Sequence, residues 1–125
     1  MNSTAFRICL IEDDRVLGEG LVERFELEGF VCDWFQTGQA ALAPLGTKPY
    51  KLVISDIGLP DVDGEQLFCR LQESGRQLPP FIFITGRGAV DRAVRLIKRG
   101  AEDYLTKPFD VEALRDQMRL ICSRD

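Results

Sequence analysis

The stretch Phe6-Arg7-Ile8-Cys9-Leu10-Ile11, followed at once by Glu12-Asp13-Asp14, decides the fold of this chain. Its first part is an apolar run of strand length, with too little polar alternation for a sheet that has one face in water. Such a run suits a strand of a parallel sheet, which is covered on both faces. The three acids then lie where this strand leaves the sheet.

Four further short apolar runs, rich in Ile, Val, Leu and Phe, recur at residues 30–35, 52–55, 81–84 and 103–105. Apolar residues with helical spacing follow the five runs, within residues 17–28, 38–45, 67–71, 90–97 and 111–121. Gly29 and Gly100 stand where two of these helices should end, and Pro44, Gly46 and Pro49 predict that the short second helix ends at Leu45. The alternation predicts an α/β fold: a doubly wound five-stranded parallel sheet with five helices on both faces.

The bulk composition narrows the class of protein. We expect residues 1–125 to form a single domain, with no output domain within the chain. A formal net charge of -4 argues against direct nucleic-acid binding by this domain, and no apolar run is long enough to span a membrane. The four cysteines lie far apart in apolar segments and are expected to be reduced core residues, which favours a cytoplasmic location. Because the chain has no histidine, imidazole-ligated metal sites and histidine-based nucleophilic catalysis are excluded.

Polar residues follow four of the five predicted strands. In an open doubly wound sheet, ligands bind beyond the carboxyl ends of the strands, so residues at these ends converge. They are Glu12, Asp13 and Asp14 after the first strand, Asp56 after the third, Thr85 after the fourth and Lys107 after the fifth. The second strand supplies nothing comparable. Neighbouring carboxylates repel each other unless a cation compensates them, and hard oxygen ligands without histidine or thiolate favour Mg²⁺.

Each residue of this set also has an ordinary structural interpretation. A single Asp after an apolar run is commonly a turn or cap residue, and Asp14 is expected to cap the first helix. Lys48-Pro49 repeats the dipeptide Lys107-Pro108 but precedes a strand, so it belongs to the other edge of the sheet. Asp33 and Asp103 lie within or at the start of strands and are excluded from the cluster for the same reason.

Four ordered motifs carry a resemblance to a known family. They are Leu10-Ile11-Glu12-Asp13-Asp14, Ser55-Asp56-Ile57-Gly58-Leu59-Pro60-Asp61-Val62-Asp63-Gly64, Ile84-Thr85-Gly86, and Gly100-Ala101-Glu102-Asp103-Tyr104-Leu105-Thr106-Lys107-Pro108-Phe109. Over nearly its whole length the chain resembles the response-regulator receiver domains of bacterial two-component systems. The resemblance implies the flavodoxin-like topology, with strand order 2-1-3-4-5.

The resemblance also implies a function for each matching position. Asp56 would be the phosphoacceptor, and Lys107 and Thr85 would bind the phosphoryl group. The Mg²⁺ ligands would be Glu12, Asp13, Asp56 and the backbone carbonyl of Gly58. Thr85 and Tyr104 match the switch pair, Pro108 would follow a cis peptide bond, and Gly58 and Arg87 flank the expected path of a hydrolytic water.

The resemblance implies a phosphorylation-dependent signalling switch. Asp56 would accept a phosphoryl group from a histidine kinase or a small phosphodonor, and the surface of the fourth helix, fifth strand and fifth helix would be remodelled. We expect the regulatory domain of a transcriptional response regulator, which is no conventional enzyme but catalyses its own phosphorylation and slow dephosphorylation. The expected partners are a sensor histidine kinase, a covalently linked output domain and a second copy of this chain bound through that surface.

Two alternatives stay open from the sequence. The chain could be a receiver-like protein-binding module that works without phosphorylation of its acidic pocket. A phosphatase with an aspartyl nucleophile would need a second acid two residues after that nucleophile, and Gly58 stands there.

Overall fold

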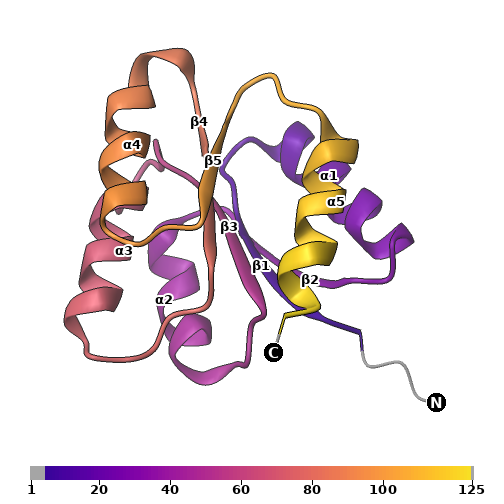
Figure 1. Ribbon diagram of the computed structural model, residues 1–125, viewed down its shortest axis with the longest axis horizontal. Coiled ribbons are helices and arrows are strands. Elements are labelled where there is room, and N and C mark those ends of the chain that lie inside the picture. Colours follow the sequence, from indigo (N-terminus) through magenta and orange to yellow (C-terminus); the bar gives the residue numbers. More distant parts are fainter. Residues whose placement is uncertain (1–4, 125) are drawn as a thin grey trace.

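Five parallel strands form one central sheet in the computed structural model, which describes residues 5–124 (Figure 1). The strands are β1 (Arg7–Ile11), β2 (Val31–Phe35), β3 (Leu52–Asp56), β4 (Phe81–Thr85) and β5 (Asp103–Thr106). Their order is β2-β1-β3-β4-β5, and every neighbouring pair is parallel. The predicted α/β fold and the strand order are therefore confirmed.

The helices cover both faces of this sheet, as Figure 1 shows, with α1 and α5 on one face and α2, α3 and α4 on the other. Their bounds are α1 (Arg15–Leu27), α2 (Gly38–Thr47), α3 (Gly64–Glu73), α4 (Val90–Lys98) and α5 (Val111–Cys122), and a short 3₁₀ turn, η1 (Arg87–Ala89), precedes α4. In the described part of the chain, none of these helices has the length and apolar character that crossing a bilayer requires.

Strand β1 explains why the opening run lacks polar alternation. Ile8 and Leu10 pack with the core beneath α1 and α5, whereas Cys9 and Ile11 pack with the core beneath α2, α3 and α4. All four side chains have 0% exposed surface. Alternate side chains of a strand point to opposite faces, so a strand with a core on each side must be apolar at every position.

The helix ends follow the sequence signals with one correction. Gly29 and Gly100 lie just past α1 and α4 with positive φ, the backbone conformation that glycine adopts without strain. The predicted end of the second helix at Leu45 is two residues too early, because α2 contains Pro44 and continues to Thr47. The last turn is closed by hydrogen bonds from the Lys48 amide to the Pro44 carbonyl and from Thr47 Oγ1 to the Ala43 carbonyl. Pro44 has no N–H to donate, but its carbonyl still accepts a helical bond from the Lys48 amide.

The four cysteines are free, as expected. Cys9 and Cys122 are buried, but Cys32 and Cys69 are only half-buried, so the prediction that all four lie in the core is corrected. Cys32 belongs to β2, which is an edge strand and has no neighbour on its outer side. Edge position leaves its side chains partly in solvent.

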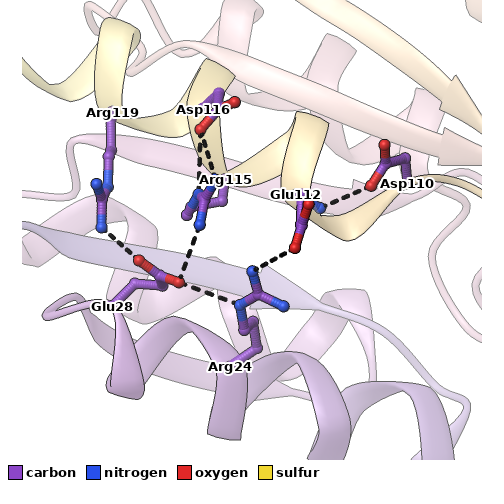
Figure 2. A network of polar contacts seen from close by, with 7 residues as sticks. All are labelled: Arg24, Glu28, Asp110, Glu112, Arg115, Asp116 and Arg119. Atoms are coloured by element: carbon purple, nitrogen blue, oxygen red, sulfur yellow. Dashed lines mark hydrogen bonds and ion pairs between the residues drawn. The ribbon is translucent and has the colours of Figure 1, made fainter.

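A cluster of ion pairs links α1 to α5, the two helices on one face of the sheet (Figure 2). The carboxylate of Glu28 accepts hydrogen bonds from Arg24 Nε at 3.2 Å, from Arg115 Nη1 at 3.4 Å and from Arg119. Desolvation raises the pKa of Glu28, but the hydrogen bonds from Arg24 and Arg115 outweigh it and hold the pKa below its ordinary value. One carboxylate at the end of α1 thus gathers arginines from two helices that are distant in the sequence.

The end of α5 lies at the amino edge of the sheet. Lys51, which directly precedes β3, donates from Nζ to the backbone carbonyl of Arg124 at 3.4 Å. Asp56 is the last residue of the same strand. The full length of β3 therefore separates the end of α5 from the carboxyl edge, where the predicted site lies.

Candidate functional site

The carboxyl edge of the sheet brings the predicted acidic residues together. Glu12 and Asp13 follow β1, Asp56 ends β3, and the strand order makes these two strands neighbours. One carboxylate oxygen from each of the three residues lies within 4.8 Å of the others. The rule that strand ends converge thus places three carboxylates in one group.

Asp56 is held on both oxygens of its side chain. Oδ1 accepts a hydrogen bond from the Gly58 amide at 3.0 Å, and Oδ2 accepts one from Lys107 Nζ at 2.8 Å. The residue is 7% exposed, so it is nearly buried yet reaches the surface. Gly64 makes this position possible, because a Cβ there would lie 2.5 Å from the carbonyl oxygen of Asp56. Only glycine lets the start of α3 approach the end of β3 so closely.

Glu12 is fully buried beside Asp56, with 0% exposure. Its Oε2 accepts a hydrogen bond from the Asp14 amide at 3.0 Å. Its Oε1 is the only buried side-chain nitrogen or oxygen atom without a hydrogen-bond partner in residues 5–124, and Lys107 Nζ lies 3.4 Å from it. Burial raises the pKa of Glu12 to about 7, and the charge of Asp56 adds to this effect, while the Asp14 amide and Lys107 oppose it.

The set of donors fits a hard divalent cation. A buried oxygen without a hydrogen bond is costly unless a further partner satisfies it. Glu12 Oε1, 3.4 Å from the Lys107 ammonium, lies in a group with two more carboxylates. Asp13 is exposed, so the group is open to solvent on one side. Oxygen ligands of this kind match Mg²⁺, which keeps several waters and takes few carboxylates from a protein. Glu12, Asp13 and Asp56 are the residues that could hold it.

Lys107 supplies the one ammonium group next to these acids in the described part of the chain. Burial by itself lowers its pKa, but the hydrogen bond and charge of Asp56 outweigh it, so the pKa of Lys107 lies above its ordinary value. The Lys107-Pro108 peptide bond is cis. The amide of Lys107 also donates to the Thr85 carbonyl at 2.9 Å, which joins the ends of β4 and β5.

The two predicted switch residues lie at different depths. Thr85 ends β4 at the same edge and is buried, and its Oγ1 donates to the Gly86 carbonyl at 2.9 Å. Tyr104 lies in β5, half-buried against the core cluster that contains Ala93 and Leu96 of α4. The structure therefore brings Thr85, but not Tyr104, to the edge that carries the carboxylates.

Sequence reasoning missed the contribution of the second strand. Trp34 donates from Nε1 to the backbone carbonyl of Glu12 at 2.9 Å, and the Glu12 amide donates to the Phe35 carbonyl at 2.9 Å. The carboxylate of Asp61 is a second contact without a signal in the strand-end pattern, and it accepts from the amides of Gly38 and Gln39 at the start of α2. Convergence of strand ends predicts only polar side chains that directly follow strands, whereas these contacts involve backbone groups or residues of a loop.

Asp63 and Arg92 were also missed. Asp63 caps α3 by accepting from the Glu65 amide at 2.8 Å, and its carboxylate pairs with Arg92 of α4. Arg92 and Arg95 also pair with Glu65, at 3.2 and 3.5 Å. The loop after Asp56 is thereby connected to α4. An i, i+3 spacing of arginines on α4 is a weak signal for such pairing.

The two carboxylates excluded from the site, Asp33 and Asp103, lie on the opposite edge strands β2 and β5. Asp33 of β2 accepts from Arg7 Nη1 at 3.1 Å and from the Tyr50 hydroxyl at 2.7 Å, and Lys48 Nζ lies 3.5 Å from it. The side chain of Asp103 accepts from Gln117 of α5 at 2.8 Å. Both carboxylates thus have structural partners.

Comparison with known proteins gives one consistent result. The chain is 40% identical over 119 residues to the transcriptional regulatory protein PmrA of Pectobacterium parmentieri, which covers 95% of this chain and 53% of PmrA. It is 41% identical over 112 residues to the response regulator protein FleR of Pseudomonas aeruginosa, covering 90% of this chain and 24% of FleR. The chain therefore spans about half of the one relative and about a quarter of the other.

A solved structure agrees with this result. The non-phosphorylated HemR receiver domain from Leptospira biflexa superposes with a TM-score of 0.85 at 30% identity, covering 96% of both chains. Residues 8–119 match the profile of the response regulator receiver domain. These residues include all five strands except Arg7, and every acid of the cluster. The chain belongs to the response regulator receiver domain family.

Proposed function

We propose that this chain is a phosphorylation switch that accepts a phosphoryl group on Asp56 and belongs to a transcriptional response regulator. The observation that carries the proposal is the environment of the Asp56 carboxylate. Its Oδ2 accepts a hydrogen bond from the Lys107 ammonium at 2.8 Å, and carboxylate oxygens of Glu12 and Asp13 lie within 4.8 Å of an Asp56 carboxylate oxygen. Glu12 Oε1 is buried without a hydrogen bond. A carboxylate that is nearly buried, held on both oxygens and next to a candidate cation site is suited to attack a phosphorus atom.

A phosphohistidine donor would lie outside residues 1–125, because these residues contain no histidine. An oxygen of Asp56 would bond to phosphorus on the side opposite the leaving group. The bond from phosphorus to the imidazole nitrogen of the donor breaks, and its electron pair stays on that nitrogen; with acetyl phosphate, the pair stays on the acetate oxygen. Lys107 would stabilise the negative charge on the transferring oxygens. Bound Mg²⁺ would supply further charge neutralisation at the phosphoryl oxygens.

Phosphorylation would be transmitted by Thr85 and Tyr104. Thr85 now donates to the Gly86 carbonyl, and it would turn to donate to the phosphoryl group. Tyr104 would then move into the space that Thr85 leaves, which alters the surface of α4, β5 and α5. A structure with beryllofluoride in which both side chains keep their positions would contradict this step.

The partners follow from this proposal. The first is a sensor histidine kinase that supplies the phosphoryl group. The second is a covalently linked output domain, for which the relatives are long enough, since the chain covers only 53% of PmrA and 24% of FleR. The third is a second copy of the chain, bound through α4, β5 and α5. The whole of residues 1–125 would act as one regulatory domain in the cytoplasm. Sedimentation with and without beryllofluoride tests the dimer.

The phosphorylation itself is tested by intact mass. The protein is incubated with acetyl phosphate and Mg²⁺, and the wild type should gain one phosphoryl group. Asp56→Asn should gain none, whereas Asp116→Asn, which changes an exposed aspartate on α5, should behave like the wild type. Absence of any mass gain, or an equal gain in Asp56→Asn, would rule out phosphorylation of Asp56.

A further inference from the structure

We infer that Trp34–Gln39, a segment that supplies no ligand, is a brace that positions the candidate Mg²⁺ site. The inference rests on the proposed function. Two loops carry the expected ligands: the acidic loop, residues 12–14, and the Gly58 loop, residues 57–63. The brace contacts both of them from the side of β2 and α2.

The acidic loop is held through the backbone of Glu12. Trp34 Nε1 donates to the Glu12 carbonyl at 2.9 Å, and the Glu12 amide donates to the Phe35 carbonyl at 2.9 Å. Both polar groups of the Glu12 backbone are therefore bonded to two consecutive residues of the brace. Since these bonds fix the backbone on either side of its Cα atom, they also fix the direction in which the buried carboxylate leaves the chain.

The indole of Trp34 is itself fixed by α1. A Cβ atom added at Gly18 would overlap with Cζ2, Cε2 and Nε1 of the indole, so the ring lies directly against the backbone of the helix. Gly18 in turn donates from its amide to the Asp14 carbonyl at 2.8 Å. The acidic loop is thus enclosed between β2 and the first turn of α1, with the indole as the contact between them.

The Gly58 loop is held by the other end of the brace. Asp61 accepts hydrogen bonds from the Gly38 amide at 2.9 Å and from the Gln39 amide at 2.8 Å, one on each carboxylate oxygen. Amides in the first turn of a helix have no partner within the helix, and an anion is favoured there, so the Asp61 carboxylate suits the start of α2. The contact is close, because a Cβ at Gly38 would lie 2.8 Å from the Val62 carbonyl.

The brace opposes the repulsion between the ligands. In the metal-free protein the carboxylates of Glu12, Asp13 and Asp56 repel each other, and a loose loop would let them separate. Mg²⁺ binding would then include the cost of bringing them back together. Residues that orient ligands commonly change metal affinity when they are removed, even though they never touch the metal. Trp34 and Asp61 are therefore positioning residues for Mg²⁺.

The test replaces the indole N–H without changing the shape of the ring. The chain has one tryptophan, so benzothienylalanine can be incorporated at position 34 alone. Calorimetric titration with Mg²⁺ should give a dissociation constant raised about three- to tenfold, the size expected for one lost hydrogen bond. Hydrogen exchange at the Glu12 amide should accelerate in the metal-free protein, while the midpoint of thermal unfolding without Mg²⁺ stays close to that of the unmodified protein.

Asp61 provides an independent second arm. Asp61→Ala should weaken Mg²⁺ binding, and Asp61→Asn, which keeps one acceptor oxygen, should recover part of the affinity. Wild-type affinity in both the position-34 analogue and Asp61→Ala would overturn the brace, as would losses of affinity that simply track losses of unfolding stability. Failure of the wild type itself to bind Mg²⁺ would overturn the proposed function together with the brace. Wild-type affinity in the altered proteins would overturn the brace alone, so the two results are distinguishable.

Discussion

Lys107 Nζ lies 2.8 Å from Asp56 Oδ2, although the two residues are 51 positions apart in the chain. We expect Lys107→Met to slow phosphorylation by acetyl phosphate roughly 100-fold, the effect of removing one preorganised donor for transition-state charge. Initial rates from intact mass measure this. Lys48→Met is the matched control, because Lys48 also precedes a proline but pairs with Asp33 in another part of the molecule. Equal rates for the two variants would contradict the proposed function of Lys107.

Glu12 should couple Mg²⁺ binding to proton release. Burial raises its pKa from 4.5 to about 7 in the metal-free protein, so the folded state holds this proton more tightly than the unfolded chain does. The contribution of Glu12 to stability is thus greatest below its ordinary pKa and is lost as the pH rises through the raised value. The apparent affinity for Mg²⁺ should therefore increase with pH up to and just above neutrality.

Calorimetry in two buffers with different ionisation enthalpies measures the protons released on Mg²⁺ binding. Near neutral pH the wild type should release a fraction of a proton, and Glu12→Gln should release much less. Equal release by both proteins would assign the proton to another group.

Two glycines of α1 should respond in opposite directions to the same substitution. Gly20→Ala should raise the free energy of unfolding by about 0.5–1 kcal/mol, because alanine is the better helix former and a Cβ at this position meets nothing within 4 Å. Gly18→Ala should lower it by about 1–3 kcal/mol, because the new methyl group displaces the indole of Trp34. Urea denaturation followed by Trp34 fluorescence measures both values. A stabilised Gly18→Ala would mean that the indole moves aside without cost.

Gly58 should control how fast the phosphoryl group is hydrolysed. A side chain at this position meets no neighbour within 4 Å of its Cβ, so Gly58→Met should fold normally. The added side chain would shield the phosphorylated Asp56 from water and lengthen its lifetime several-fold. The decay of the phosphorylated mass after removal of acetyl phosphate gives the rate. An unchanged lifetime would exclude access past residue 58 as the limiting factor.

The ion pairs of Figure 2 should make stability depend on salt. Glu28→Gln removes the carboxylate shared by Arg24, Arg115 and Arg119, so the unfolding midpoint should fall at low ionic strength. The difference from the wild type should shrink in high salt, which screens these charges. Glu23→Gln is the control, since no ion pair involves Glu23 in the described residues. A deficit that is the same at all salt concentrations would indicate lost packing and not lost charge.

The sequence was sufficient for those features that depend on strand ends. Alternate packing on two cores requires the apolar run of β1, and parallel strands bring Glu12, Asp56 and Lys107 to one edge whatever the loops do. The helix ends at Gly29 and Gly100 could also be predicted from the sequence, because a backbone position with positive φ favours glycine. Such features follow from one residue type and its position along the chain.

The remaining features depend on what lies opposite a residue in space. Pro44 predicts the end of a helix, yet α2 continues past it to Thr47. The missing N–H removes one helical hydrogen bond, while the bond from the Lys48 amide to the Pro44 carbonyl still closes the last turn. In the sequence Trp34 is an aromatic residue of a predicted strand. Its contact with the acidic loop becomes evident only in the structure, where Gly18 leaves room for the ring. In the sequence Asp61 is an acid of a predicted loop, and only the structure shows that the start of α2 lies next to it. Contacts between two residues that are far apart in the chain leave no regular spacing in the sequence from which they could be predicted.

The contact between Lys51 and the Arg124 carbonyl has a practical consequence for measurement. A surface anchor or a fluorescent label attached at the end of α5 would be at the opposite edge of the sheet from Asp56. The pocket would then stay accessible to small phosphodonors and to Mg²⁺. Residues 5–124 would therefore be suited to immobilisation in a biosensor, in which the proposed phosphorylation could be followed on single tethered molecules.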